Sequence, residues 1–356
     1  MSRFKIKTLL DKIEDKNYSD IHICEDKQVA VRWNNGEIQR LDDILDRDEI
    51  FGFANSINTP NQIDALLNGE EIDNAYTHNN NRYRINIYAD MNGMNMALRR
   101  IPQKVPNMKD INLPEYIKDV LHKDKWLILV TWPTGSWKST TVASLVNYIN
   151  QNMKKHIITL EDPIEFVFKE KKGLINQRNV WKNTKSWGNW IKYALREDPD
   201  IIMVWEMRDQ ETIQAVLTLV ETWHLVISTL HTSSWPQTIS RIINAFSPNK
   251  QNMIATQLSL SLEMVISQRL IEKTDWNGRV AAREILLADS AISNLIRENK
   301  IAQIFSVLET WSKKWMITMD RSLAYLIANK QIKLENAIPY IRNENTFKEL
   351  INYYIR

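Results

Sequence analysis

The sequence predicts an α/β fold of two domains, in which the second domain has a mostly parallel sheet. Two observations lead to this prediction. A chain of 356 residues is long enough for about two domains. From residue 126 onward, short apolar runs alternate with helix-like segments, and the first of these runs, WLILV at 126–130, is apolar throughout. Such a run is typical of a parallel strand that is covered on both faces.

The first domain is expected over residues 1–100 as a small α/β unit. A helix-like start is followed by two alternating runs within 19–41, then by short helices at 46–57 and 60–68, and by two further strand-like runs before residue 102. Prolines at 102, 106 and 114 and weak periodicity predict a linker over 101–113. The second domain then spans 114–356.

Within the second domain, strands are expected at 126–130, at HIITLED (156–162), at DIIMV (200–204) and at LVISTL (225–230). Helices are expected directly after the first strand, around 186–197, at 209–220 and from there through about 271, apart from the strand at 225–230. The residues from about 284 to 356 are expected to form a helical tail.

Composition excludes several classes of protein. Forty-six basic and 43 acidic side chains leave a net charge of +3, so no overall field favours nucleic acid or anionic lipid. We therefore expect no direct contact with nucleic acid, and contact with a membrane only peripherally, through partners. The single cysteine, Cys24, suits a reducing compartment, and no stretch approaches the length of an apolar span. A cytoplasmic protein is expected.

The stretch LVTWPTGSWKSTT (129–141) has the outline of a phosphate-binding loop between a strand and a helix. In such a loop, backbone N–H groups hold phosphate, the lysine contacts the β- and γ-phosphates, and the next Ser or Thr binds Mg²⁺. Two tryptophans stand where glycine is needed. An ordinary polar turn is the alternative interpretation. The candidate nucleotide-binding residues are Trp132, Pro133, Thr134, Gly135, Ser136, Trp137, Lys138, Ser139 and Thr140.

Three further stretches place polar side chains where predicted strands end. TLEDPIEF (159–166) supplies Glu161, Asp162 and Glu165, and REDPDIIMVWEMRD (196–209) supplies Glu206. ETWHLVISTLHT (221–232) supplies His231. The carboxyl ends of parallel strands are where ligands bind, although each stretch alone could be a solvated loop or a packed histidine.

Taken in order, these four stretches resemble the Walker A, Asp box, Walker B and His box of the secretion and pilus ATPases, the GspE/PilT superfamily of hexameric RecA-like motors. SDIHI (19–23), RYRINIY (82–88) and INQR (175–178) are similar to other segments of that family. AISNLIRE (291–298) is similar to the C-terminal AIRNLIRE signature of its pilus retraction ATPases, with Ser293 in place of arginine. The resemblance covers nearly the whole chain.

The resemblance implies a RecA-like P-loop ATPase domain after a PAS-like N-terminal domain, with ATP and Mg²⁺ as cofactors. It implies Lys138 on the phosphates and Ser139 and Asp162 at the metal. Glu206 would act as general base or orient the attacking water, with Glu161, Asp162 and Glu165 in support. His231 would sense the γ-phosphate, and Arg84 and Arg99 would act as arginine fingers. The alternative interpretation of Arg84 and Arg99 is that they are charged residues on the solvent-facing side of their strands.

The same resemblance implies a homo-hexamer at the cytoplasmic face of the cell membrane. Its partners would be a pilus inner-membrane platform protein and the pilus machinery, and its work would be pilus retraction for twitching motility. A secretion or conjugation ATPase of the same superfamily is the alternative, and a scaffold unable to bind nucleotide is another if the tryptophans in the motifs are genuine.

Tryptophan is unusually frequent and glycine unusually rare, with 13 and 8 residues. Glycine averages about 7% of residues in proteins. By the resemblance, Trp126, Trp132, Trp137, Trp205 and Trp223 fall on family glycines, and Trp235, Trp276, Trp311 and Trp315 lie in contexts that look like turns. Our hypothesis is that a codon, UGA above all, is read as glycine in the source organism and is rendered here as tryptophan.

Overall fold

A computed structural model describes residues 5–33, 36–101, 104–131, 138–180, 190, 193–275, 278–304 and 316–355. Its internal contacts divide the chain into two compact units. The first comprises Met1–Val105 together with Pro163–Val167, and the second comprises Pro106–Asp162 and Phe168–Arg356. Each unit is described by itself below. Among the described residues, no helix combines the length and the apolar character that a membrane span requires.

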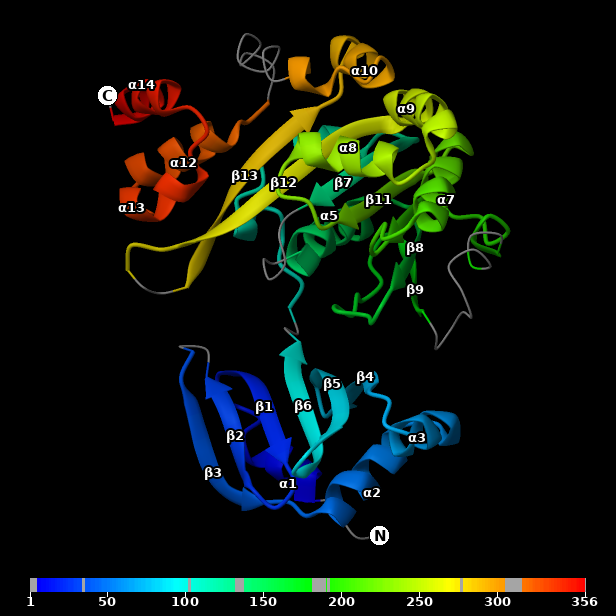
Figure 1. Ribbon diagram of the computed structural model, residues 1–356, viewed down its shortest axis with the longest axis vertical. Coiled ribbons are helices and arrows are strands. Elements are labelled where there is room, and N and C mark those ends of the chain that lie inside the picture. Colours follow the sequence, from blue (N-terminus) through cyan, green and yellow to red (C-terminus); the bar gives the residue numbers. More distant parts are fainter. Residues whose placement is uncertain are drawn as a thin grey trace. The chain divides into compact units, whose positions relative to one another are not determined.

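The N-terminal unit is a six-stranded antiparallel sheet in the order β3-β2-β1-β6-β5-β4, with three helices (Figure 1). Burial alternates along β5, as expected for a sheet with one face on the core. Asp46 begins α2 with a capping box, because its carboxylate accepts from the Glu49 backbone N–H at 2.9 Å. The elements are α1 (Lys5–Lys12), β1 (Tyr18–Cys24), β2 (Gln28–Trp33), β3 (Ile38–Ile44), α2 (Arg47–Ile57), α3 (Pro60–Leu67), β4 (Ile72–His78), β5 (Asn81–Asp90) and β6 (Gly93–Ile101).

The two short helices of this unit are confirmed, but the prediction of four strands is wrong. Each run taken as two strands contains three, since β3 follows β2 and β4 precedes β5. The burial of β3 explains one omission. None of its seven residues is fully buried, so its sequence shows no clear alternation of apolar and polar residues.

The C-terminal unit is built on a seven-stranded mixed sheet in the order β13-β12-β7-β11-β10-β8-β9. The pairs from β12 to β9 are parallel, and only the β12–β13 pair of this sheet is antiparallel. This confirms the predicted α/β class with a mostly parallel sheet. The strands are β7 (Trp126–Thr131), β8 (His156–Glu161), β9 (Leu174–Asn179), β10 (Ile201–Val204), β11 (Leu225–Leu230), β12 (Leu262–Glu272) and β13 (Arg279–Leu287).

Helices follow most of these strands. The helical elements are η1 (Lys109–Ile111), α4 (Ile117–Leu121), α5 (Lys138–Asn152), α7 (Gln210–Glu221), α8 (Trp235–Asn244), α9 (Pro248–Ser261), α10 (Ser290–Arg297), α12 (Met319–Ala328), α13 (Leu334–Ala337), η2 (Ile338–Tyr340) and α14 (Glu344–Ile355). The helix expected around 186–197 falls mostly outside the described residues. The helix expected at 209–220 is confirmed as α7.

The expectation of helices through about 271, followed by a helical tail from about 284, is wrong at one point. Residues 262–287 form the long hairpin of β12 and β13, and helices resume at Ser290. Seven consecutive residues of β12 are buried, so the segment has neither a helical nor an alternating period. Its β-branched residues and the partner strand β13 decide the conformation.

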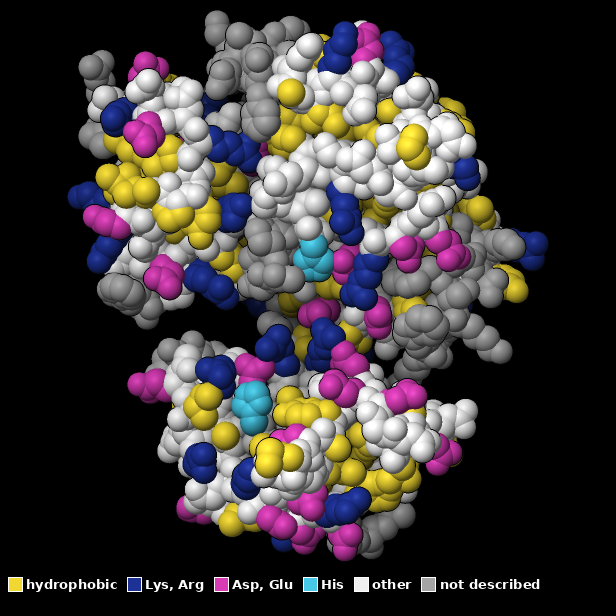
Figure 2. Space-filling model, viewed as in Figure 1, with side chains coloured by type: hydrophobic (Ala, Val, Ile, Leu, Met, Phe, Trp, Pro, Cys, Tyr) yellow, Lys and Arg dark blue, Asp and Glu magenta, His cyan; other side chains and the backbone are white. Residues whose placement is uncertain are grey.

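The last three helices pack beside the hairpin as a small group of their own (Figure 1). The guanidinium of Arg342 donates two hydrogen bonds, of 2.9 and 2.7 Å, to the buried carboxylate of Glu284 on β13. The carboxylate of Asp320 on α12 accepts from the backbone N–H of Arg342 at 2.9 Å. Figure 2 shows hydrophobic side chains on the surface of this group, where Tyr325, Leu334 and Ile338 are exposed.

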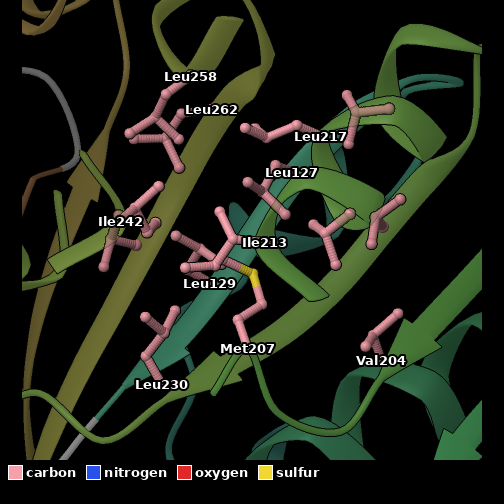
Figure 3. Packing of buried hydrophobic residues seen from close by; sticks show 14 of the residues in the cluster. Leu127, Leu129, Val204, Met207, Ile213, Leu217, Leu230, Ile242, Leu258 and Leu262 are labelled. Carbon is pink, nitrogen blue, oxygen red and sulfur yellow. The ribbon is translucent and has the colours of Figure 1, made fainter. Parts of the chain in front are cut away.

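The main core of this unit lies between the sheet and α7, α8 and α9. Figure 3 shows side chains of β7, β10 and β11 meeting those of the three helices. The alternate residues of β7, Ile128 and Val130, are also fully buried, so both faces of the central strand are covered. The labelled members of this core are Leu127, Leu129, Val204, Met207, Ile213, Leu217, Leu230, Ile242, Leu258 and Leu262.

Candidate nucleotide site

The carboxyl ends of four neighbouring strands bring most of the described residues among the predicted site residues to one edge of the sheet. β7 ends at Thr131, just before the loop, β8 ends at Glu161, and β10 and β11 end just before Glu206 and His231. Because β8, β10, β11 and β7 pair in parallel, these ends lie at the same edge. Polar side chains at that edge of a parallel sheet are typical of a ligand site.

Glu206 and His231 are in contact. The Nε2 atom of His231 lies 3.3 Å from Oε1 of Glu206, and the Nε atom of Arg208 donates to Oε2 at 2.8 Å. Glu206 is only 7% exposed, while the His231 side chain is 35% exposed. Both carboxylate oxygens of Glu206 therefore have a cationic or polar neighbour, and these contacts fix the orientation of the carboxylate.

The backbone around Glu206 is held against β11 by several hydrogen bonds. The Ser228 hydroxyl donates to the carbonyl of Val204 at 2.9 Å, and the Met207 N–H donates to the carbonyl of Thr229 at 3.0 Å. The Thr229 hydroxyl donates to the Trp205 carbonyl. These bonds lie on both sides of Glu206 in the sequence. They fix the position from which its side chain projects.

Glu161 is a second buried carboxylate at this edge. It is 2% exposed, and its Oε1 atom accepts from the Thr159 hydroxyl at 2.8 Å and from the amide of Gln177 on β9 at 3.0 Å. Asp162 follows it directly and is partly exposed. Carboxylate and hydroxyl oxygens are the ligands that Mg²⁺ prefers.

The predicted phosphate loop is only partly described. Trp132, Pro133, Thr134, Gly135, Ser136 and Trp137 lie outside the described residues. Helix α5 begins at Lys138, and the next residues, Ser139 and Thr140, are partly exposed in its first turn. A loop that joins a buried strand to a helix N-terminus is the setting that a phosphate loop requires.

A group of hydroxyl side chains beside this loop was not predicted from the sequence. Thr131 at the end of β7 lies 2.9 Å from the Ser267 hydroxyl, and the Thr238 hydroxyl on α8 lies 2.7 Å from that of Thr232. The Thr141 hydroxyl donates to Gln268 at 2.8 Å. Only pairing with β12, which the sequence did not reveal, brings Ser267 and Gln268 here.

The two predicted finger arginines lie in the N-terminal unit. Arg84 on β5 is directly opposite Arg99 on β6 in the antiparallel register. Arg84 Nε donates to Asp73 at 3.1 Å, and its Nη1 lies 3.7 Å from Oε1 of Glu165, whose segment groups with this unit. Arg99 Nε donates to Asp20 at 2.8 Å, and its side chain is 72% exposed. Carboxylates thus orient both guanidinium groups at the surface.

The structure supports a glycine at the position of Trp223. This residue follows the last turn of α7 with a φ of +69°. Its N–H donates to the Val220 carbonyl at 3.1 Å, and the N–H of His224 donates to the Leu219 carbonyl at 3.4 Å. These two bonds form a Schellman motif, whose left-handed residue is usually glycine.

The other tryptophans behave differently. Trp205 is 7% exposed and Trp126 is the first residue of β7. The assignment of Trp235 to a turn is wrong, because it begins α8 and is completely buried in the core. Trp276, Trp311 and Trp315 lie outside the described residues.

We predict that Trp223→Gly stabilises the protein. A left-handed tryptophan costs about 1–3 kcal/mol in backbone strain. Trp223 is 69% exposed, and its ring contacts the ammonium of Lys125 at 4.0 Å, so the loss of packing is small and the free energy of unfolding should rise by about 1 kcal/mol. Denaturant unfolding measures the change. The control is Trp33→Gly, which should lower the stability. Trp33 lies in β2, and its ring packs edge to face against the ring of Tyr18, with the two centroids 6.5 Å apart. An equal loss of stability in both variants would contradict the interpretation.

The sheet order, the beginning of α5 at Lys138 shortly after the end of β7, and the buried glutamate that follows β10 define a P-loop ATPase domain of the RecA-like kind. The chain belongs to the family of type II/IV secretion system proteins, whose family model matches residues 3–325.

Similar proteins come from both sequence and structure. The chain is 42% identical over 305 residues to a twitching motility protein of Neisseria gonorrhoeae. This match covers 85% of the chain and 82% of the Neisseria protein. It is 47% identical over 256 residues to the type IV pilus retraction ATPase PilT of Pseudomonas aeruginosa, and this match covers 72% of the chain and 74% of the Pseudomonas protein. A crystal structure of the pilus retraction motor PilT with bound ADP matches with a TM-score of 0.88 and 39% identity, covering 97% and 99%.

Proposed function

We propose that this protein is an ATP-hydrolysing motor that works as a ring of six copies and retracts a type IV pilus. The observation that carries the proposal is the pair of Glu206 and His231, 3.3 Å apart at the edge of the sheet where the phosphate loop begins. The similarity to PilT, in sequence and in a structure with bound ADP, supports the choice of substrate and of work.

In this proposal, each residue at the edge has one task. Lys138 and the backbone of the loop bind the phosphates of ATP. Glu206 orients the attacking water and accepts its proton, since it is a buried carboxylate whose Oε1 atom lies 3.3 Å from the partly exposed imidazole of His231. His231 contacts Glu206 from the end of β11 and senses the γ-phosphate, and Glu161 supports the site. Glu165 belongs to a segment that groups with the N-terminal unit, where it lies 3.7 Å from Arg84.

Mg²⁺ would supply charge neutralisation on the phosphates. Ser139, in the first turn of α5, and Asp162, after β8, would hold it, and their oxygen atoms suit this hard cation. Arg84 and Arg99 would reach the γ-phosphate of ATP bound by a neighbouring copy. Hydrolysis would then change the relation between the two domains, which we propose to be 1–100 and 114–356, joined by a linker at 101–113.

The proposed partners are a platform protein of the inner membrane and the pilus machinery. The proposed location is the cytoplasmic face of that membrane, reached through these partners, since the near-neutral net charge of +3 offers no field of its own. If the tryptophans in the motifs are genuine, a scaffold that binds no nucleotide is the second candidate, and the tryptophans in the phosphate loop are the observation that favours it.

The role of Glu206 can be tested with Glu206→Gln in a protein that carries glycine at 132 and 137. The amide keeps the shape and loses the basic oxygen, so turnover should fall about 10²–10⁴-fold while ATP still binds. Phosphate release and a nucleotide titration measure the two properties. Glu211→Gln, on the exposed first turn of α7, is the control. Full turnover in Glu206→Gln would refute the proposed role.

The arginine fingers can be tested in the same background. Arg84→Ala should lower turnover about 10³–10⁵-fold, because the arginine stabilises charge on the transferred phosphate. ATP binding by the isolated chain should persist. Arg40→Ala, in exposed β3 of the same sheet, is the control. Full activity in monomeric Arg84→Ala would exclude action across an interface between copies.

A further inference from the structure

A cavity of about 540 Å³ lies in the C-terminal unit, among β13, α12, α14 and the segment around Tyr116. None of the residues that line it belongs to the candidate nucleotide site. Its volume is within the range of about 300–1,000 Å³ that is usual for small-molecule sites. The residues that decide its chemistry are Tyr116, Arg283, Arg321, Ser322, Tyr325 and Tyr354.

The guanidinium of Arg283 is buried in the wall of this cavity without a counter-ion among the described residues. Arg283 is 5% exposed, and its Nε atom has no hydrogen-bond partner in the described part of the chain. Its Nη1 atom donates one long hydrogen bond of 3.4 Å to the Asn112 carbonyl. Burial lowers the pKa of Arg283 to about 10. An isolated buried charge of this kind is strongly unfavourable.

The next residue on β13 shows what a satisfied buried charge looks like in the same unit. Glu284 is 1% exposed, and Arg342 binds both of its oxygens at 2.9 and 2.7 Å. The two buried charges on these adjacent residues of β13 therefore differ in whether a counter-ion lies beside them. Glu284 has its ion pair within the chain, whereas Arg283 faces a space large enough for a ligand.

The other residues that line the cavity supply a positive charge and aromatic rings, which together suit a ligand that has both an anionic group and a flat ring. Arg321 on α12 supplies a second cation, and its Nε atom donates to the Tyr354 hydroxyl at 3.0 Å. The lining residues include no Asp or Glu. Tyr325 and Tyr354 meet edge to face with centroids 5.6 Å apart, and Tyr325 is 49% exposed, so an aromatic surface reaches the solvent.

We propose that this cavity binds a small aromatic or heterocyclic molecule that carries a phosphate or carboxylate, with Arg283 as the partner of the anion. The planar guanidinium matches such groups in a two-pronged geometry. The tyrosine rings hold the flat part of the molecule. Bound there, the ligand connects β13 to α12 and α14. The proposal does not depend on ATP hydrolysis.

Thermal unfolding of the full chain with phenyl phosphate tests the proposal. At about ten times the dissociation constant, the unfolding temperature should rise by about 2–5 °C. Phenol, which lacks the anion, should give no shift, and inorganic phosphate, which lacks the ring, should give a smaller one. The chain with Lys138→Ala should keep the full shift, which separates this site from the phosphate loop.

Arg283→Met should abolish the shift and keep or raise the unfolding temperature without ligand, because it removes an unpaired buried charge. Arg279→Met, on the exposed end of the same strand, should change neither. Arg321→Met should weaken the shift and serves as the second variant. No saturable shift with phenyl phosphate would overturn the proposal. The proposal would also be overturned if Arg283→Met were much less stable or no longer assembled into the same oligomer. Arg283 would then have its partner within the protein or its assembly.

Discussion

With glycine in place of Trp132 and Trp137, the protein is expected to bind ATP, and the chain as written is expected not to. A phosphate loop turns successive N–H groups toward the phosphate, and glycine is needed where the backbone is left-handed or comes close to the ligand. An indole at those positions would fill the space that the phosphate needs. The double variant should turn over ATP with a KM between about 1 μM and 1 mM, and ATP binding should be detectable in that range of concentration.

Titration with a fluorescent ATP analogue measures this gain. Trp223→Gly alone is the matched control, because it restores a glycine outside the loop and should not create a site. ATP binding by the chain as written would contradict the prediction. The gene provides an independent test, since UGG codons at positions 132, 137, 205 and 223 would exclude the reading of another codon as glycine.

The left-handed positions of the structure strengthen this argument. Apart from Trp223, the described non-glycine residues with positive φ are Asp26, Asn79, Asn112, Asp198, Asn299 and Lys330. Asn and Asp adopt this conformation more readily than other residues, and bulky side chains do so rarely. Trp223 is therefore an outlier in the backbone as well as in the motif. Trp235, by contrast, is completely buried in the core and shows no such conflict.

The candidate site was largely predictable because its residues follow strands with strong local signals. The run before Thr131 and the strand before Glu206 are continuously apolar, the run before His231 is mostly apolar, and parallel strands place their carboxyl ends together. The contact between Glu206 and His231 was less predictable. It requires β10 and β11 to be direct neighbours, which is a property of sheet order that residue patterns do not encode.

The cavity beside Arg283 could not be predicted from the sequence. Arg283 stands in AAREILL, where an arginine and a glutamate are the two charged residues of an otherwise apolar run and would be expected at the surface. Both are buried only because α12 and the residues before α14 cover this part of β13. The hairpin itself was missed, since β12 is buried on both faces and has no period. Long-range packing determines this region.

Lys138→Ala is expected to abolish ATP turnover in the protein with glycine at 132 and 137, while the fold remains intact. Lys138 is the first residue of α5 and follows the loop after β7, so the variant removes the positive charge nearest to the predicted phosphates without touching the core. Loss of one such electrostatic contact lowers turnover by about 10²–10³-fold or more. The apolar residues of α5 that lie under the sheet, Val142, Leu145 and Val146, keep their packing, so the unfolding temperature should stay the same.

Phosphate release and thermal unfolding measure the two expectations together. The matched control is Lys250→Ala, which changes an exposed lysine of α9 and should retain full turnover. Turnover retained in Lys138→Ala would refute the assignment of the phosphate loop. Turnover lost together with the folded state would show instead that Lys138 is needed for the fold. Loss of turnover with an unchanged unfolding temperature is therefore the result that assigns this lysine to the phosphates.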